Sequence, residues 1–196
     1  MLVIKQRCEW AKTDLLLMQY HDDEWGTPVF NGQMLFEFLT LEGMQAGLSW
    51  LTILKKREHF RAAFDNFDVK KIASYDINKF NALINDAGLI RNKLKIQSVI
   101  NNAHAFLEVE KELGDFSKYL WNFVNGKPIL NQWQSASQIP AQSAISDLMA
   151  KDLKKRGFKF VGSKICYALM QATGMVNDHT INCFRHQTIK KSGLPR

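Results

Sequence analysis

The sequence predicts an all-α protein. Apolar side chains recur at helical spacing through most of the 196 residues, whereas the strict alternation that is typical of half-buried strands is scarce. Residues that favour helix caps stand at the ends of several of these segments. Only residues 127–130 and 158–161 are compatible with short strands. A chain of this length favours one globular domain, residues 1–196, with one hydrophobic core.

In the first half of the chain, residues 33–46 carry apolar groups at the spacing of a helix. A second helix is expected over 51–64, because Ser49 stands just before it and can accept a hydrogen bond from a free backbone N–H. Two short helices should follow, opened by caps at Asp68 and Asp76 and ending near Ser74 and Asp86.

In the second half, one long amphipathic helix is expected over 91–113. Gly114 should end it, since glycine readily adopts the left-handed conformation that closes helices. Three more helices are predicted over 117–124, 144–156 and 163–173.

The composition is that of an ordinary soluble globular protein, with 46% hydrophobic and 23% charged residues. No apolar run approaches the ~18 residues that span a bilayer, so no membrane segment is expected. The N-terminal apolar stretch is too short for a secretory signal. Three cysteines make no disulfide framework, which favours a reducing, cytoplasmic setting. Cys166 lies in a periodic apolar stretch and is expected in the core.

The net charge of +7 and the pI of about 9.3 favour a polyanionic partner. Residues 185–196 form a basic tail. A second cluster of basic residues lies within residues 151–164, where Asp152 is the single acidic residue. Such a cluster is ordinarily explained as the solvated face of a helix. The cluster leads directly into a turn at Gly162, which favours phosphate binding instead. Its cations are Lys151, Lys154, Lys155, Arg156, Lys159 and Lys164.

The turn at Gly162 separates the end of a basic helix from a new helix that begins at about Ser163. Backbone N–H groups at a helix N-terminus point outward and bind phosphate readily. The predicted phosphate-binding residues are therefore Gly162, Ser163, Lys164 and Lys159.

Two cysteine–histidine pairs stand at opposite ends of the chain: Cys8 with His21, and His179 with Cys183. On a helix, His179 and Cys183 would share one face. Two thiolates and two imidazoles complete a tetrahedral zinc site with no position left for water. Such a site would be structural and would join residues 8–21 to 179–183. In the competing interpretation the cysteines are small apolar residues and the histidines are unrelated.

Glu42 is unusual because its predicted helix is otherwise apolar. A buried carboxylate needs a donor, a cation or a ligand, although a helical glutamate more often reaches solvent or an arginine. Gly43 and Gly47 would leave room beside it. Nearby aromatic residues either wall a flat pocket around this charge or form an ordinary core cluster; they are Trp10, Tyr20, Trp25 and Trp50.

In these segments the sequence resembles the Tag-type 3-methyladenine DNA glycosylases of the helix–hairpin–helix superfamily. The resemblance runs from Arg7 to about Cys183, nearly the whole chain, and so many matches in order are highly specific. The matching stretches are Tyr20-His-Asp-Asp-Glu-Trp-Gly, Leu41-Glu-Gly-Met-Gln-Ala-Gly-Leu-Ser-Trp50, Leu54-Lys-Lys-Arg-Glu58, Arg156-Gly-Phe-Lys-Phe-Val-Gly162 and Val176-Asn-Asp-His179.

The resemblance implies the helix–hairpin–helix glycosylase fold, with that element at about 147–174, and a structural zinc clip at the four cysteines and histidines. It implies that double-stranded DNA containing alkylated bases is the partner and that the enzyme hydrolyses the N-glycosidic bond of 3-methyladenine. In the pocket, Glu42 would be the catalytic residue, Glu42 and Tyr20 would hydrogen-bond the base, and Trp50 would stack on it. A monomer is expected.

The sequence departs from the pattern of the superfamily at Asn177, a position where many relatives carry an aspartate. Asp178 is then a candidate to activate water or to orient the zinc histidine. No lysine stands at the position where bifunctional relatives, which also cleave the DNA strand, hold the amine that forms a Schiff base. Hydrolysis without strand cleavage is therefore predicted. Two alternatives remain open: a zinc-stabilised DNA-binding module without catalysis, and a zinc hydrolase, which would need an exchangeable position on the metal.

Overall fold

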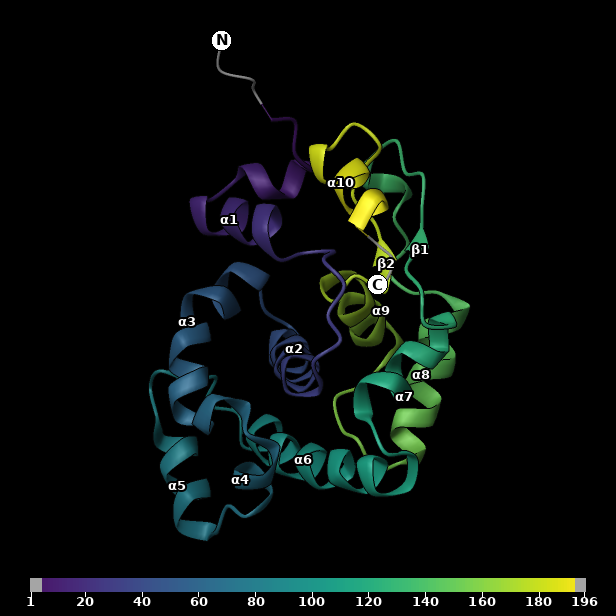
Figure 1. Cartoon of the computed structure of the whole chain (residues 1–196). Helices are drawn as coiled ribbons and strands as arrows, with labels where there is room; N and C mark the ends of the chain where they lie inside the picture. The colour runs from purple at the N-terminus through teal and green to yellow at the C-terminus, as the bar shows by residue number, and fades with distance from the viewer. Residues whose placement is uncertain (1–4, 193–196) are drawn as a thin grey trace.

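The fold is mostly helical, as predicted, in a computed structural model that describes residues 5–192 (Figure 1). Short 3-10 turns lie at Glu9–Lys12, Asp65–Phe67, Asn122–Val124 and Ala136–Gln138. In chain order the α-helices are α1 (Leu15–Asp23), α2 (Gly32–Gln45), α3 (Trp50–Ala63), α4 (Val69–Ala73), α5 (Ile77–Asn85), α6 (Lys93–Leu113), α7 (Phe116–Trp121), α8 (Ala144–Lys155), α9 (Ser163–Ala172) and α10 (Phe184–Ser192).

The predicted caps are confirmed. The Ser49 side chain accepts a hydrogen bond from the backbone N–H of Thr52, and the Asp68 and Asp76 side chains cap α4 and α5 in the same way. Gly114 closes α6 with a φ of 83°. The long helix begins at Lys93 rather than at 91, because the side chain of Asn92 accepts from the first free N–H groups.

Two helices were not predicted. The Asp14 side chain caps α1, and α10 occupies most of the basic tail, of which residues 193–196 lie outside the described part. The strand prediction is confirmed only in part. Strand β1 (Ile129–Leu130) pairs in parallel with β2 (Val176–Asn177), but 158–161 is no strand because Phe160 adopts a left-handed φ of 53°.

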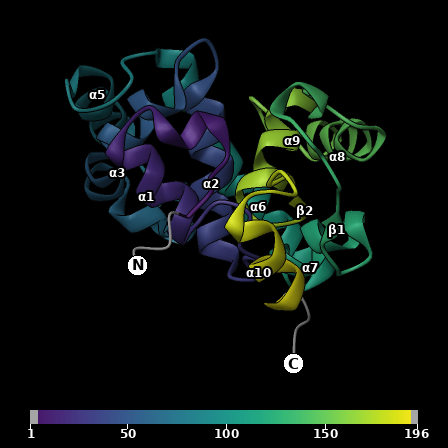
Figure 2. The same cartoon turned by 90° about the horizontal axis from the view of Figure 1, so that it is seen from above.

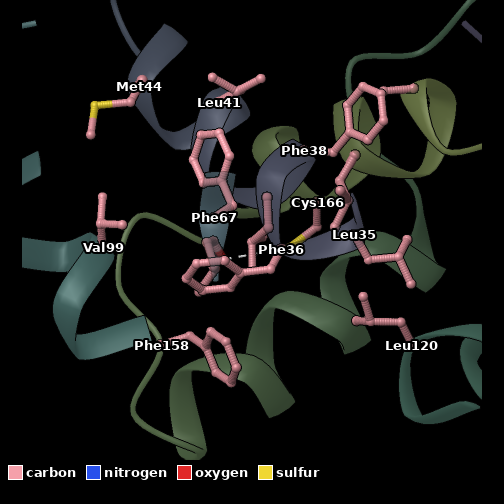
Figure 3. Close-up of a cluster of buried hydrophobic side chains, with 14 of the residues drawn as sticks. Leu35, Phe36, Phe38, Leu41, Met44, Phe67, Val99, Leu120, Phe158 and Cys166 are labelled. Carbon is pink, nitrogen blue, oxygen red and sulfur yellow. Dashed lines mark hydrogen bonds between the residues drawn. The ribbon is translucent and has the colours of Figure 1, made fainter. Parts of the chain in front are cut away.

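Helix α2 passes through the middle of the molecule, between α1 and α3 on one side and α7 to α9 on the other (Figure 1). Every residue from Leu35 to Met44 is buried. Figure 3 shows α2 side chains in one buried hydrophobic cluster with residues of other segments, including Val99 on α6, Leu120 on α7 and Phe158. A helix that is buried all round must also bury its polar residues, and α2 carries two carboxylates.

In the view from above, α1, α3 and α5 lie on one side and α7 to α10 on the other, with α2 and α6 between them (Figure 2). Segments near the beginning and the end of the described chain lie side by side, where the N–H of Phe184 donates to the carbonyl of Gln6 at 2.9 Å. Within residues 5–192, no helix has the length and apolar character to cross a membrane.

Candidate active site

A cavity of about 620 Å³ opens between α1, α2, α3 and α9, with the 136–140 segment on its rim. Its volume suits a small organic ligand such as a nucleobase. The fold brings all the predicted pocket residues to this one cavity, although they come from separate segments: Trp10, Tyr20, Trp25, Glu42 and Trp50.

The aromatic rings lie at large angles to one another rather than in a parallel stack. The ring centroids of Trp10 and Trp25 lie 5.1 Å apart at 78°, and those of Tyr20 and Trp50 lie 5.4 Å apart at 50°. Their faces and edges therefore form walls on which a planar, positively charged ring can stack.

Glu42 is 5% exposed and has no hydrogen bond or ion pair to any described residue. Burial alone raises the pKa of its carboxyl group to about 8. The second α2 carboxylate, Glu37, is also buried, but Arg57 and Arg61 donate to it at 2.7 and 3.0 Å. The protein therefore neutralises one buried acid and leaves the one that faces the cavity unpaired.

Two buried donors beside Glu42 also have no partner. They are the hydroxyl of Tyr20 and the indole N–H of Trp50. Burial, and then the nearby Glu42, raise the pKa of Tyr20, so its hydroxyl keeps its proton. Unsatisfied buried polar groups are rare in folded proteins and indicate a missing partner. Beside the unpaired Glu42 carboxyl group, two donors are therefore free for a polar ligand.

The four predicted metal ligands are all buried, and their ligand atoms lie within 4.8 Å of one another. The Sγ of Cys183 lies 3.4 Å from Nε2 of His21 and 3.5 Å from Nδ1 of His179, and Cys8 Sγ lies 3.6 Å from the same Nδ1. The prediction that these residues converge is confirmed. His179 and Cys183 do not share a helix, however: the chain turns through them and α10 begins only at Phe184.

Neighbouring groups hold both imidazoles in place for a cation. Nδ1 of His21 donates to Asp22 at 2.8 Å, and Nε2 of His179 donates to the carbonyl of Trp25 at 3.0 Å. The opposite nitrogens are then unprotonated and face the sulfurs, as in zinc sites. The hydrogen bond between the thiols lowers the pKa of Cys183 and raises that of Cys8, so the pair shares one proton that a dication would displace.

The connection between α8 and α9 presents Gly162 as the residue before the first turn of α9, with no side-chain cap. A Cβ atom added there would meet no protein atom. Lys159 and Lys164 are exposed, and neither ammonium group contacts an acid in the described part of the chain. Ser163 instead turns its hydroxyl to that of Ser146 at 2.8 Å.

Two expectations are corrected by the contacts. Arg156 is not a free cation of the basic cluster, because it pairs with Asp152 and Glu112 at 2.8 and 2.7 Å. Asp178 does not orient His179 and does not line the cavity; both of its oxygens accept hydrogen bonds from other side chains. With both oxygens occupied, it is not placed to activate water.

Sequence reasoning missed several cavity residues, among them Gln45, Ile139, Pro140, Ala168 and Gln171. One signal for part of this set was present. Ala168 and Gln171 are three residues apart and share the face of α9 that continues from Lys164. The 136–140 segment carried no such signal, since its place on the rim depends on its distant contacts.

Comparisons with known proteins show the family to which this chain belongs. The methyladenine glycosylase family matches residues 10–186. The DNA-3-methyladenine glycosylase 1 of Escherichia coli strain K12 is 49% identical over 178 residues, covering 91% of this chain and 95% of that protein. The DNA-3-methyladenine glycosylase of Haemophilus influenzae is 46% identical over 90% of this chain and 96% of that protein.

Solved structures also match most of this chain. A crystal structure of 3-methyladenine DNA glycosylase I (TAG) superposes with a TM-score of 0.89 at 49% identity, covering 91% of this chain and 98% of that one. The Staphylococcus aureus enzyme, solved for its recognition of 3-methyladenine, gives a TM-score of 0.88 at 35% identity, with coverages of 91% and 95%. This chain is a member of the methyladenine glycosylase family.

Proposed function

We propose that this protein is a monofunctional DNA glycosylase that hydrolyses the N-glycosidic bond of 3-methyladenine in alkylated double-stranded DNA. The observation that carries the proposal is the unpaired, buried carboxylate of Glu42 in an aromatic cavity. The names of the relatives support the same activity. A DNA-binding module without catalysis would have no use for an unneutralised acid in its interior.

The cavity chemistry suits this substrate. Methylation at N3 makes adenine cationic in DNA and weakens its bond to the sugar, because the base departs as a neutral molecule. A carboxylate and aromatic faces favour that cation over neutral adenine through charge pairing and cation–π attraction. Tyr20, with its free hydroxyl, and Glu42 would hydrogen-bond the base while Trp50 stacks on it.

The reaction begins with the damaged nucleotide leaving the duplex stack, which costs a few kcal/mol and costs least for a damaged base. As the bond to the base breaks, the base takes the bonding electrons and leaves neutral, and positive charge develops on the sugar. The carboxylate of Glu42 and the DNA phosphates stabilise that charge while water attacks the anomeric carbon and releases a proton to the solvent. The described residues that line the cavity include no lysine, which supports hydrolysis without a Schiff base or strand cleavage.

The direct test is base release from methylated duplex DNA. We expect chromatography to detect free 3-methyladenine and a gel to show an abasic strand that breaks only after alkali. Immediate strand cleavage would contradict the monofunctional mechanism. Absence of any released base, from protein that is folded and binds the DNA, would support the non-catalytic module instead.

We also infer that Cys8, His21, His179 and Cys183 hold a structural zinc ion. The burial of all four, their convergence and the hydrogen bonds on the far side of both imidazoles support this assignment. Four protein ligands leave no position for a catalytic water, so the alternative of a zinc hydrolase is not favoured.

The DNA backbone would bind at the N-terminus of α9, through Gly162, Ser163 and Lys164 with Lys159 beside them, in a helix–hairpin–helix element formed by α8 and α9. A monomer acting in a reducing cytoplasm completes the proposal, and the free, buried thiols are compatible with it.

Replacing both Lys159 and Lys164 with Ala is expected to weaken DNA binding and to reduce the slope of log K against log salt by about 1 for each lysine that meets a phosphate. Lys70→Ala, at an exposed lysine on α4, is the matched control. Fluorescence anisotropy at several salt concentrations measures the slopes. Equal slopes for the double variant and the control would place the footprint elsewhere.

A further inference from the structure

The carboxylate of Asp178 is 1% exposed, and four neutral donors saturate it. Oδ1 accepts from the side-chain amide of Asn131 and the indole of Trp133, both at 2.7 Å. Oδ2 accepts from the hydroxyl of Tyr167 and from Nε2 of Gln171, both at 2.8 Å. No cation is among these partners, so the arrangement differs from a buried ion pair.

This carboxylate decides which way the Gln171 amide points. Gln171 turns its NH₂ group toward Asp178, where Nε2 donates to Oδ2, and the three other partners of this carboxyl group donate to it as well. Gln171 also lines the aromatic cavity, one helical turn after Ala168. Its remaining polar atom, Oε1, is therefore an acceptor that cannot exchange places with the NH₂ group without losing the bond to Asp178.

We propose that Gln171 is a specificity-determining residue of the cavity, a fixed hydrogen-bond acceptor that favours a purine presenting an exocyclic amine over one presenting a carbonyl. Asp178 is its positioning residue. The inference rests on the proposed function, since it takes the cavity to be the base site. Tyr20 and Trp50 offer donors, and Glu42 alone could either donate or accept near its raised pKa, so a permanent acceptor adds selectivity that they lack.

Asp178 also contacts the segment that leads into another part of the cavity lining. Asn131 and Trp133 precede the 136–140 segment, in which Ala136, Ile139 and Pro140 line the same cavity. One carboxylate thus holds the α9 wall and the start of this rim segment together. A test must therefore separate the orientation of Gln171 from simple support of the rim.

The variant Asp178→Asn makes that separation possible. The Trp133 indole can only donate, so the new amide must keep its oxygen toward Trp133 and turn its NH₂ toward Tyr167 and Gln171. The Tyr167 hydroxyl can rotate to accept, whereas Gln171 must flip and present its NH₂ to the cavity. We expect the affinity for free 3-methyladenine to fall about tenfold, as for a lost hydrogen bond that leaves two donors facing each other.

The same flip should improve binding of 3-methylhypoxanthine, which carries a carbonyl in place of the amine, relative to 3-methyladenine. The double variant Asp178→Asn with Gln171→Glu restores an acceptor at 171, keeps the net charge, and should recover most of the preference for the amine. Gln171→Met removes the acceptor and should lose the preference without reversing it. Gln97→Met, on the exposed face of α6, is the matched control.

Tryptophan fluorescence titration measures both affinities, and zinc content and melting temperature are measured alongside because Asp178 precedes His179. Wild-type preference in Gln171→Met would overturn the proposal. Equal losses for both bases in Asp178→Asn, not recovered in the double variant, would also overturn it and leave Asp178 a purely structural role. A wild-type protein that binds neither base and releases none would refute the proposed function itself.

Discussion

Replacing Glu42 with Gln is expected to slow base release on the order of 100-fold, the size typical for removing one preorganised electrostatic group. The amide keeps the shape of the side chain but cannot carry the negative charge that favours the cationic base and the developing sugar cation. DNA affinity should stay near the wild-type value, because the proposed contacts to the DNA backbone come from the N-terminus of α9 and not from the Glu42 side chain. Single-turnover release from methylated DNA and anisotropy on undamaged DNA measure the two properties.

The same variant should stabilise the free protein at alkaline pH. The folded pKa of Glu42 is about 8, above its unfolded value of 4.5. A native acid with a raised pKa holds its proton longer than the unfolded chain does, so stability is lost as pH rises from about 4.5 to 8 and the loss then levels off. We expect Glu42→Gln to exceed the wild type by up to a few kcal/mol above pH 8, with the difference shrinking toward pH 5.

Glu37→Gln provides the contrast, because that carboxylate is paired with Arg57 and Arg61. Its replacement leaves the buried Arg57 guanidinium with Glu24 as its remaining ion-pair partner, and the loss of the buried counter-charge should destabilise the protein instead. Thermal melts of both variants and of the wild type across pH 5 to 9 show whether the two replacements change stability in opposite directions. A Glu42→Gln melting temperature that follows the wild type at every pH would mean that Glu42 reaches water or a partner in solution.

Replacing Cys8 with Ser is expected to lower the melting temperature by 10 °C or more, the largest stability change that we predict. Binding of a structural zinc ion stabilises only the folded state, so losing it costs several kcal/mol, and each kcal/mol shifts the melting temperature by about 2–4 °C in a protein of this size. A strong chelator should lower the melting temperature of the wild type and leave the variant unchanged.

Cys166→Ala is the control, since Cys166 is equally buried but contacts the carbonyl of Val161 rather than the metal ligands. It should keep one zinc per chain by elemental analysis, whereas Cys8→Ser should not. Loss of the ion should also weaken base binding, because His179 donates to the carbonyl of Trp25 and His21 follows Tyr20 directly. A wild-type melting temperature indifferent to chelation would remove the zinc assignment.

Local sequence signals were enough to predict most of the helices and the types of residue that form the candidate site. Ser49, Asp68, Asp76 and Gly114 act within one helical turn, so their effect can be read from neighbouring residues alone. The α1 helix was missed because its buried face meets partners that are far away in the chain, and periodicity within nine residues shows little of that. The α10 helix was missed because its sequence is mostly polar.

The sequence by itself determined the helical class, the two cysteine–histidine pairs and the unusual position of Glu42 in an apolar helix. Each of these depends on a residue and its near neighbours. Only the tertiary structure decided which charges are neutralised: Arg156 is paired, Glu37 is paired, and Glu42 is not. It also decided that Asp178 serves Gln171 rather than His179. These outcomes depend on burial and on contacts between distant segments, and the free energy of a buried polar group is set by the partners that the fold brings to it.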